Sequence, residues 1–388
     1  MTHDLKERIA MVADAIDLPP MILASVARDG SSFDFAFNKH DERTSFSLDT
    51  VCWLASMTKL VTSVAVLQLV ERGKLTLGTD AWDYLPELRD TKVLVGFDAE
   101  GSATLAPPET PIIIRQLLTH TAGFSYDTWN AQTDRFMRQN DLPGVITCKS
   151  EALSLPLGHH PGARWEYGIN LDFIGRIVEQ VSGCDLATYF TKNVFEPLGM
   201  RDTSFLLRED QKVRLADMMR RSGDGEVSAV QFDLINQSPE FFMGGAGLYG
   251  TARDYLKLLQ ALIRGGSLDS NAILKEETVG AMCSNQIGDL RVRPLPSIQP
   301  EWSNDMSAVF RYGDKWGFGS LISDQNLPSG AAAGSMFWGG VANTYFWADC
   351  KSGLAGVMMT QLLPFADPGV LAAFDGLRKA GYARQNVS

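Results

Sequence analysis

The stretch from residue 54 to residue 73, LASMTKLVTSVAVLQLVERG, constrains the fold more than any other part of the sequence. Its apolar residues recur at the spacing of a helix that packs into a core, and Gly73 suits the position after the last turn. We therefore predict a helix over residues 56–72. Its start is unusual, because Lys59 would lie in an apolar environment, where a lysine is costly unless it is compensated.

Ser56 and Lys59 form an SxxK pattern at the start of this helix. Residues three apart share a helix face, so the hydroxyl and the amine would be neighbours, and a confined lysine can accept the serine proton. A helix N-terminus also favours developing negative charge. The alternative is that Ser56 only caps the helix and Lys59 reaches solvent, and the spacing alone does not decide between them.

Composition excludes several classes of protein. The chain has 388 residues, of which 45% are hydrophobic, so it can form one large core or two interleaved domains. A net charge of −11 argues against nucleic-acid binding. The segment after Met1 is charged and has no apolar signal-peptide core, and no run suits a membrane helix. We expect a soluble, cytoplasmic protein with no membrane partner.

The cysteines and histidines show no metal pattern. Five cysteines are widely spaced, with no CxxC, and the five histidines do not complete a zinc site. We expect buried free thiols, no metal and no organic cofactor. Cys52 is close to Ser56 in sequence, but no base beside it indicates a catalytic cysteine.

The order of elements predicts an α+β fold. A hairpin is expected at 21–37, and short strands at 317–324, 343–350 and 353–362. Helices are expected over these ranges: 56–72, 112–123, 170–183, 186–200 with a stop before Pro197, and 368–383.

This order suggests an antiparallel sheet covered by the first and last helices, with a mostly helical domain inserted. We assign residues 1–75 and 240–388 to the α/β domain and residues 76–239 to the helical domain. The active site is expected in the cleft between the two domains.

Two further segments carry candidate chemistry. Tyr167 precedes an amphipathic helix, and a tyrosine near cations can relay protons. Gly339 and Gly340 precede a predicted strand and allow a substrate to approach closely, and the next N–H, of Val341, could stabilise an oxyanion. The alternatives are a tyrosine that only packs and a plain tight turn.

Two patterns are set aside. Residues 245–250 fit GxGxxG, but no parallel strand precedes them, so we do not predict nucleotide binding. The α/β-hydrolase motif GxSxG is absent. His120 and the pair His159-His160 are therefore not obvious members of a catalytic triad, and we interpret His120 as a structural hydrogen-bonding residue at a helix end.

Taken together, the amino-acid sequences of five segments resemble those of the serine β-lactamase and penicillin-binding-protein superfamily. Within it, the chain resembles the class C-like branch that holds the family VIII carboxylesterases and fungal statin acyltransferases. The resemblance covers about residues 20 to 365. The segments are LASMTKLVTSVAVLQLVERGKLTL, IIIRQLLTHTAGF, EYGINLDFIGRIVEQVSG, FEPLGMRDTSF and GGAGLYGTARDYLKLLQALIRGG.

This resemblance implies roles for particular residues and the β-lactamase/transpeptidase-like fold. Ser56 would be the acylated nucleophile, with Lys59 and Tyr167 sharing the proton transfers. The backbone N–H groups of Ser56 and Val341 would form the oxyanion hole. The positions that resemble substrate-binding residues of these esterases are Tyr126, Asp172, Trp338, Gly339 and Gly340.

Two departures from the β-lactamase pattern indicate the substrate. Trp338 stands where β-lactamases have the lysine of KTG, and Ile169 stands where they have the asparagine of Tyr-x-Asn. Without that lysine, the site lacks a charge for a substrate carboxylate, and a tryptophan offers a flat apolar surface. These aromatic residues suggest a roomy apolar cleft: Trp53, Tyr126, Trp129, Phe241, Phe242, Trp302 and Trp338.

We therefore expect a serine carboxylesterase that acts on small apolar esters of short-to-medium acyl chain, with at most weak β-lactamase activity. The alternatives are an acyltransferase to a bulky alcohol, a hydrolase of D-amino acid amides, and a non-catalytic scaffold. The sequence does not indicate an oligomeric state.

Overall fold

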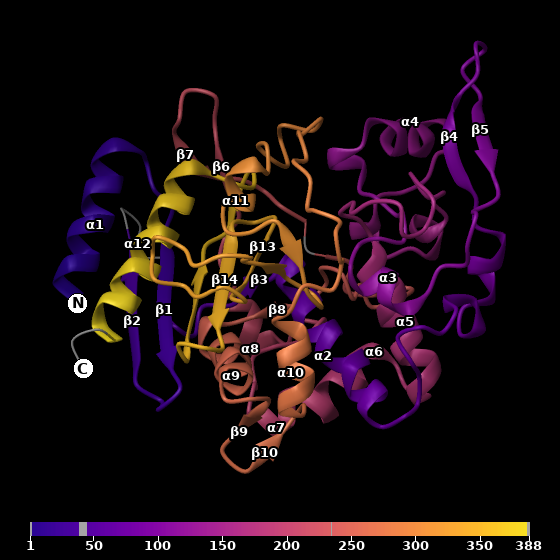
Figure 1. Cartoon of the computed structure of the whole chain (residues 1–388). Helices are drawn as coiled ribbons and strands as arrows, with labels where there is room; N and C mark the ends of the chain where they lie inside the picture. Colours follow the sequence, from indigo (N-terminus) through magenta and orange to yellow (C-terminus); the bar gives the residue numbers. More distant parts are fainter. Residues whose placement is uncertain (1, 39–44, 234, 386–388) are drawn as a thin grey trace.

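A seven-stranded antiparallel sheet forms the centre of the structure, a computed structural model that describes residues 2–38, 45–233 and 235–385 (Figure 1). The N-terminal hairpin joins the C-terminal strands at one edge, because β1 pairs with both β2 and β15. In spatial order the strands are β11 (Lys315–Trp316), β12 (Leu321–Ile322), β13 (Met336–Gly340), β14 (Thr344–Asp349), β15 (Leu354–Met359), β1 (Met21–Ala27) and β2 (Ser32–Phe37).

Helices cover both faces of this sheet. Consecutive residues of a strand point to opposite faces. In β14, Phe346 contacts Tyr255 of α9 (Ala252–Ile263), and the next residue, Trp347, contacts Phe374 of α12 (Pro368–Gln385). Helix α1 (Thr2–Ala15) packs on α12, at the outer side of the molecule (Figure 1). The sheet is therefore buried between α9 and the pair α1 and α12.

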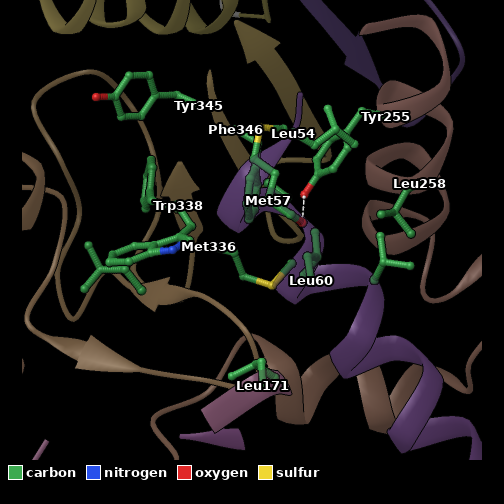
Figure 2. Packing of buried hydrophobic residues seen from close by; sticks show 14 of the residues in the cluster. Leu54, Met57, Leu60, Leu171, Tyr255, Leu258, Met336, Trp338, Tyr345 and Phe346 are labelled. Atoms are coloured by element: carbon green, nitrogen blue, oxygen red, sulfur yellow. Dashed lines mark hydrogen bonds between the residues drawn. The ribbon is translucent and has the colours of Figure 1, made fainter. Parts of the chain in front are cut away.

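Helix α2 (Thr58–Glu71) connects the sheet to the helical region. Twelve of its fourteen residues are buried, and it packs against α5 (Asn170–Ser182) and α6 (Leu186–Phe190). A 3-10 turn, Ala55–Met57, precedes it. Figure 2 shows Met57 and Leu60 among buried side chains from the strands, α5 and α9. The first turn of α2 is thus enclosed on all sides by core residues.

The remaining elements are short. The small sheets are formed by β3 (Cys52–Trp53) with β8 (Tyr249–Gly250), β4 (Val93–Phe97) with β5 (Ala103–Ala106), β9 (Ser267–Leu268) with β10 (Asn271–Ala272), and β16 (Leu362–Leu363) with β6 (Met219–Arg221) and β7 (Val227–Ala229). The remaining α-helices are α3 (Ile114–Leu118), α4 (Ala131–Gln139), α7 (Glu196–Leu198), α8 (Glu209–Lys212), α10 (Glu276–Met282) and α11 (Ser307–Phe310).

One strand pairing crosses the predicted domain boundary. Strand β6 lies within residues 76–239, which were assigned to the helical domain, but it pairs with β16 of the α/β domain. The division into domains stays a prediction.

Periodicity predicted the long amphipathic elements correctly. The hairpin at 21–37 is confirmed as β1 and β2, and the helix at 170–183 as α5, which ends at Gly183 with a φ of 72°. The helix at 56–72 is confirmed as α2 with its preceding turn, and Gly73 has a φ of 66° after the last turn. These elements each bury one continuous apolar face or body.

Several other boundaries were wrong. The helix expected at 112–123 is only α3, because the chain turns at His120, whose φ is 56°. The helix at 186–200 is α6, a π-turn at Thr191–Phe195 and α7, and Pro197 lies in the first turn of α7. The range 317–324 contains only β12, and 353–362 is divided between β15 and β16. Gly339 and Gly340 precede a strand as predicted, since β14 begins at Thr344, but they also form the end of β13.

All five cysteines are free, and the two in the buried class are Cys52 and Cys148. Burial raises the pKa of Cys52 well above its usual range, as expected for an inert thiol. Across the described ranges, no group of histidine, cysteine and carboxylate side chains could hold a metal ion. In that same part of the chain, no helix is both long and apolar enough to cross a membrane.

Candidate active site

Ser56 lies in the 3-10 turn that leads into α2, where hydrogen bonds from two other elements fix the backbone. The Tyr255 hydroxyl of α9 donates a hydrogen bond to the Met57 carbonyl at 3.0 Å (Figure 2). The Thr344 hydroxyl of β14 donates to the Leu54 carbonyl at 3.3 Å. Ala55 has a φ of 45°, a conformation that is costly for a residue with a Cβ and is maintained only by surrounding structure. The turn therefore holds Ser56 in a constrained position.

Lys59 is completely buried one turn after Ser56. Its Nζ donates to Ser56 Oγ at 3.1 Å, to the Tyr126 hydroxyl at 3.1 Å and to the Gly245 carbonyl at 2.8 Å. Burial lowers the pKa of Lys59 to about 7, although the negative charge of Asp172 opposes this change. Near neutral pH, a substantial fraction of the amine is therefore unprotonated and can accept a proton from Ser56.

Tyr167 completes this group of side chains. Its hydroxyl accepts a hydrogen bond from Trp338 Nε1 at 3.2 Å, and its ring centroid is 4.7 Å from Lys59 Nζ. Burial raises the pKa of Tyr167 above its usual range, against smaller lowering effects of hydrogen bonds to Ser56 and Trp338. The phenol therefore stays protonated, which suits a residue that passes a proton between two oxygens.

His120 positions the loop that carries Tyr167. Its Nδ1 lies 3.3 Å from the Gly168 nitrogen and 3.0 Å from Asn170 Nδ2. Burial lowers the pKa of His120 well below its usual value, so the ring is neutral. Asn170 also donates to the Phe124 carbonyl at 3.1 Å. Its side chain therefore links the start of α5 to the segment that contains His120 and Phe124. The predicted structural role of His120 agrees with these contacts.

A cavity of about 390 Å³ opens above Ser56. Its lining includes Ser56, Tyr126 and Val341, so three of the predicted site residues meet there, and none of the described lining residues is lysine or arginine. The full lining is Trp53, Ser56, Tyr126, Asp127, Thr128, Trp129, Gly144, Val145, Ile146, Thr147, Ala246, Gln299, Glu301, Trp302 and Val341. Four aromatic rings give this cavity an extensive apolar surface.

Trp338 does not occupy the place expected for it. It is 2% exposed, does not line the cavity and lies behind Tyr167, with its ring centroid 4.7 Å from that of Trp316. The pleat of β13 directs this side chain into the core, which a motif comparison does not reveal. Its indole N–H donates to the Tyr167 hydroxyl, and the predicted contact of Trp338 with substrate stays a prediction.

Gly339 and Gly340 are also packed against protein, and neither lines the cavity. A Cβ on Gly340 would lie 2.3 Å from the Leu54 carbonyl oxygen, and one on Gly339 would lie 2.6 Å from the Thr344 oxygen. These glycines therefore let β13 approach the turn of Ser56 and the neighbouring strand. Val341, directly after β13, lines the cavity with Ser56, and the oxyanion role of their N–H groups stays a prediction.

Asp172 is fully buried and is not among the residues that line the cavity. Its Oδ1 accepts a hydrogen bond from the Gly245 nitrogen at 2.8 Å, and burial raises its pKa to about 6. The side chain reaches from α5 to Gly245, and its predicted role in substrate binding stays a prediction. Tyr126, in contrast, both lines the cavity and contacts Lys59.

Sequence reasoning missed Gly245 as a site residue. Its carbonyl accepts from Lys59, its N–H binds Asp172, and the next residue, Ala246, lines the cavity. The only signal was the glycine-rich segment 245–250, which was considered for nucleotide binding and set aside. Glycine is required there, because a Cβ would lie 2.6 Å from Asp172 Oδ2.

Known proteins share this sequence and architecture. A lovastatin esterase of Penicillium rubens is 32% identical over 383 residues, covering 92% of this chain and 93% of that protein. A monacolin J acid methylbutanoyltransferase of Aspergillus terreus is 33% identical over 339 residues, covering 83% of this chain and 79% of that protein. Both relatives are thus similar over most of their length.

Solved structures agree with the fold. The unliganded simvastatin synthase LovD of Aspergillus terreus has a TM-score of 0.82 at 29% identity and covers 98% of both chains. EstCE1, a hydrolase with promiscuous acyltransferase activity, has a TM-score of 0.75 at 22% identity, covers 98% of this chain and 99% of that chain, and shows the shared fold alone. The sequence profile of the family described as Beta-lactamase matches residues 20–378. The chain, with its antiparallel sheet, its helices and the pair formed by Ser56 and the buried Lys59, therefore belongs to the β-lactamase family.

Proposed function

We propose that the protein is a serine carboxylesterase of the family VIII type that hydrolyses esters through an acyl-enzyme on Ser56. One observation carries the proposal: Ser56 Oγ lies 3.1 Å from the Nζ of a fully buried lysine whose pKa is lowered to about 7. A nucleophile beside a base that is neutral near the working pH is the arrangement that acyl transfer requires.

In the acylation step, Lys59 takes the proton of Ser56 while Oγ attacks the ester carbonyl. The N–H groups of Ser56 and Val341, both on the cavity wall, stabilise the tetrahedral oxyanion. As the tetrahedral intermediate collapses and the ester C–O bond breaks, Tyr167 gives its phenol proton to the leaving alkoxide and is reprotonated by Lys59, which becomes neutral again. Its hydrogen bonds to Ser56 and Trp338 support this role, because they hold the phenol between the nucleophile and the core.

In the deacylation step, water attacks the acyl-enzyme at the same carbonyl carbon. The Lys59 and Tyr167 pair accepts the water proton, the bond to Ser56 Oγ breaks, and the serine is reprotonated. The products are the carboxylic acid and the free enzyme. No metal or organic cofactor supplies any of these steps.

The substrate proposed is a neutral ester with a short-to-medium apolar acyl group. The rings of Trp53, Trp129 and Trp302 support it, as does the lack of a basic residue among the described lining residues. Asp127 and Glu301 on the wall would repel a carboxylate. The same reasoning predicts at most weak hydrolysis of β-lactams, which carry a carboxylate.

A second candidate function is acyl transfer to a bulky alcohol. The similarity to the methylbutanoyltransferase and to simvastatin synthase favours it, and the same acyl-enzyme would serve both reactions. The two functions differ only in whether water or an alcohol attacks second. Hydrolysis of D-amino acid amides and a non-catalytic scaffold role have no specific observation in their favour.

Hydrolysis of 4-nitrophenyl butyrate by the wild type and by Ser56→Ala tests the proposal. We expect turnover by the wild type and a loss of about 10⁴-fold or more in the variant. Adding candidate alcohols and measuring new esters separates transfer from hydrolysis. Full activity of a folded Ser56→Ala protein would show that Ser56 is not the nucleophile.

A cytoplasmic location also stays a proposal, which cell fractionation would test.

A further inference from the structure

Asp172 is a buried carboxylate that the mechanism above does not use. Its side chain has no exposure, and its Oδ2 has no hydrogen-bond partner among the described residues. A buried polar atom without a partner costs free energy, so a compensating interaction is expected nearby. Asp172 is also not among the residues that line the cavity at Ser56.

Gly245 connects Asp172 to Lys59. Its N–H donates to Asp172 Oδ1 at 2.8 Å, and its carbonyl accepts from Lys59 Nζ at 2.8 Å. The carboxylate lies directly against the glycine Cα, since a Cβ there would be 2.6 Å from Oδ2 and 3.0 Å from Oδ1. The carboxylate and the amine are therefore held on the two sides of one residue.

Other contacts fix Gly245 in this place. The Thr62 hydroxyl of α2 donates to the Gly244 carbonyl at 2.6 Å. A Cβ on Gly244 would lie 2.7 Å from the Leu171 carbonyl of α5. The turn at 244–245 is thus enclosed between the helix that carries Lys59 and the helix that carries Asp172, and its position is set by both.

The other titratable groups around Lys59 and Asp172 are uncharged near neutral pH. Tyr126 and Tyr167 lie over Lys59 Nζ, with ring centroids at 5.3 and 4.7 Å, and burial keeps both phenols protonated. His120 is buried and neutral, and burial also keeps the Cys148 thiol protonated, with a pKa of about 12. Asp172 therefore supplies the main negative charge that acts on Lys59.

We infer that Asp172 is a positioning residue that acts on Lys59 through Gly245 and is not a residue that binds substrate. Its charge favours the protonated amine during the step in which Lys59 accepts the serine proton. Its hydrogen bond to Gly245 directs the carbonyl that holds Nζ towards Ser56. The inference rests on the proposed role of Lys59 as base.

The test measures the rate at which a fluorophosphonate probe labels Ser56 as a function of pH, in wild type and Asp172→Asn. Asparagine keeps an oxygen that can accept from Gly245, removes the charge, and places an amide nitrogen where Oδ2 stood. The lysine should lose its proton more easily, so we expect the acid limb of the profile to move to lower pH by about 1 unit. We also expect a slower plateau, because a less basic lysine is a weaker base.

Thr62→Val is the matched control, because it removes a contact of the same turn without changing any charge. Its acid limb should stay at the wild-type pH. Asp172→Ser is a second neutral variant if the asparagine protein does not fold, and it should show the same shift. An unchanged acid limb in a folded neutral variant, whether KM rises or only the stability falls, would overturn the inference.

Probe labelling also separates this inference from the proposed function. Labelling of Ser56 without hydrolysis of any ester would reject the esterase and leave the role of Asp172 to be decided by the pH profile. Failure of the probe to label Ser56 in the folded wild type would reject both.

Discussion

Among the described residues, one lysine and one arginine side chain are buried, and their surroundings differ. Arg378 in α12 is 2% exposed and donates to Asp375 Oδ1 at 3.1 Å and to Ser329 Oγ at 2.6 Å. It also lies against the rings of Tyr312 and Phe337, at 4.6 and 4.7 Å. Lys59 is equally buried, but its three acceptors are two hydroxyls and a carbonyl, all uncharged.

The difference shows that a buried basic side chain can either stabilise the fold as a charged group or act as a base as a partly neutral one. A guanidinium with a carboxylate partner stays charged, because its pKa begins far above neutral pH and its partner favours the charge. Neutral acceptors stabilise a buried ammonium group less than a carboxylate would, and burial therefore lowers the pKa of Lys59 to about 7. The carboxylate nearest to Lys59 acts across Gly245, so the compensation is incomplete.

The largest expected effect comes from replacing each cation by methionine. Lys59→Met should lower kcat/KM for 4-nitrophenyl butyrate by about 10⁴-fold, because the base is lost. The melting temperature should stay the same or rise, because a costly buried polar group is removed. Activity assays on protein shown to be folded by circular dichroism would measure both effects.

Arg378→Met is the matched control for that comparison. It should lower the free energy of unfolding by about 2 kcal/mol, because Asp375 and Ser329 lose a buried partner. Activity per folded molecule should stay close to the wild-type value. If both variants lost activity equally, or if Lys59→Met were the less stable one, the distinction between the two cations would be wrong.

The next effect is the pH dependence of the wild type. Lys59 must be unprotonated to accept the serine proton, and its pKa is lowered to about 7. We therefore expect kcat/KM to rise about tenfold per pH unit below about pH 7 and to level above it. Steady-state assays from about pH 5 to about pH 9 measure this limb, and Arg378→Met should not move it. A limb near the usual lysine pKa would show that burial does not act as described.

The smallest effect is expected at Trp338, which neighbours Lys59 only through Tyr167. Trp338→Phe removes the indole N–H that donates to the Tyr167 hydroxyl and keeps an apolar ring in the core. We expect kcat to fall about fivefold, equivalent to roughly 1 kcal/mol, with KM unchanged. Kinetics with a series of acyl chain lengths would check this. A KM that changes with chain length would instead mean that Trp338 contacts the substrate.

How far the sequence predicts the site depends on the range of the interaction. Ser56 and Lys59 are one helical turn apart, so their proximity follows from local geometry, and α2 and α5 follow from apolar periodicity. The direction of Trp338 and the burial of Asp172 depend on how β13 and α5 meet their neighbours. No local pattern contains that information, and both were expected on the substrate side.

Gly245 shows the same limit more sharply. It is 186 positions from Lys59, and both of its hydrogen bonds to the site come from its backbone N–H and carbonyl, which every residue type except proline can supply. Only the need to omit a Cβ beside Asp172 selects its identity. The short helices α3 and α7 were also mispredicted, because turns at His120 and at the π-turn after Phe190 interrupt an otherwise helical pattern.

The hydrogen bond from Thr344 to Leu54 has a consequence for when the protein becomes active during its synthesis. It joins positions 290 residues apart, and it helps to hold the turn of Ser56. The ribosome therefore synthesises Ser56 and Lys59 early, whereas β13 and Val341, which lies directly after it, are synthesised late. A nascent chain that ends before β13 contains the whole SxxK motif and still lacks half of the proposed oxyanion hole. Reactivity towards esters should therefore begin only once β13 and β14 have joined the sheet, so that slow long-range pairing, and not the motif, sets the onset of catalysis.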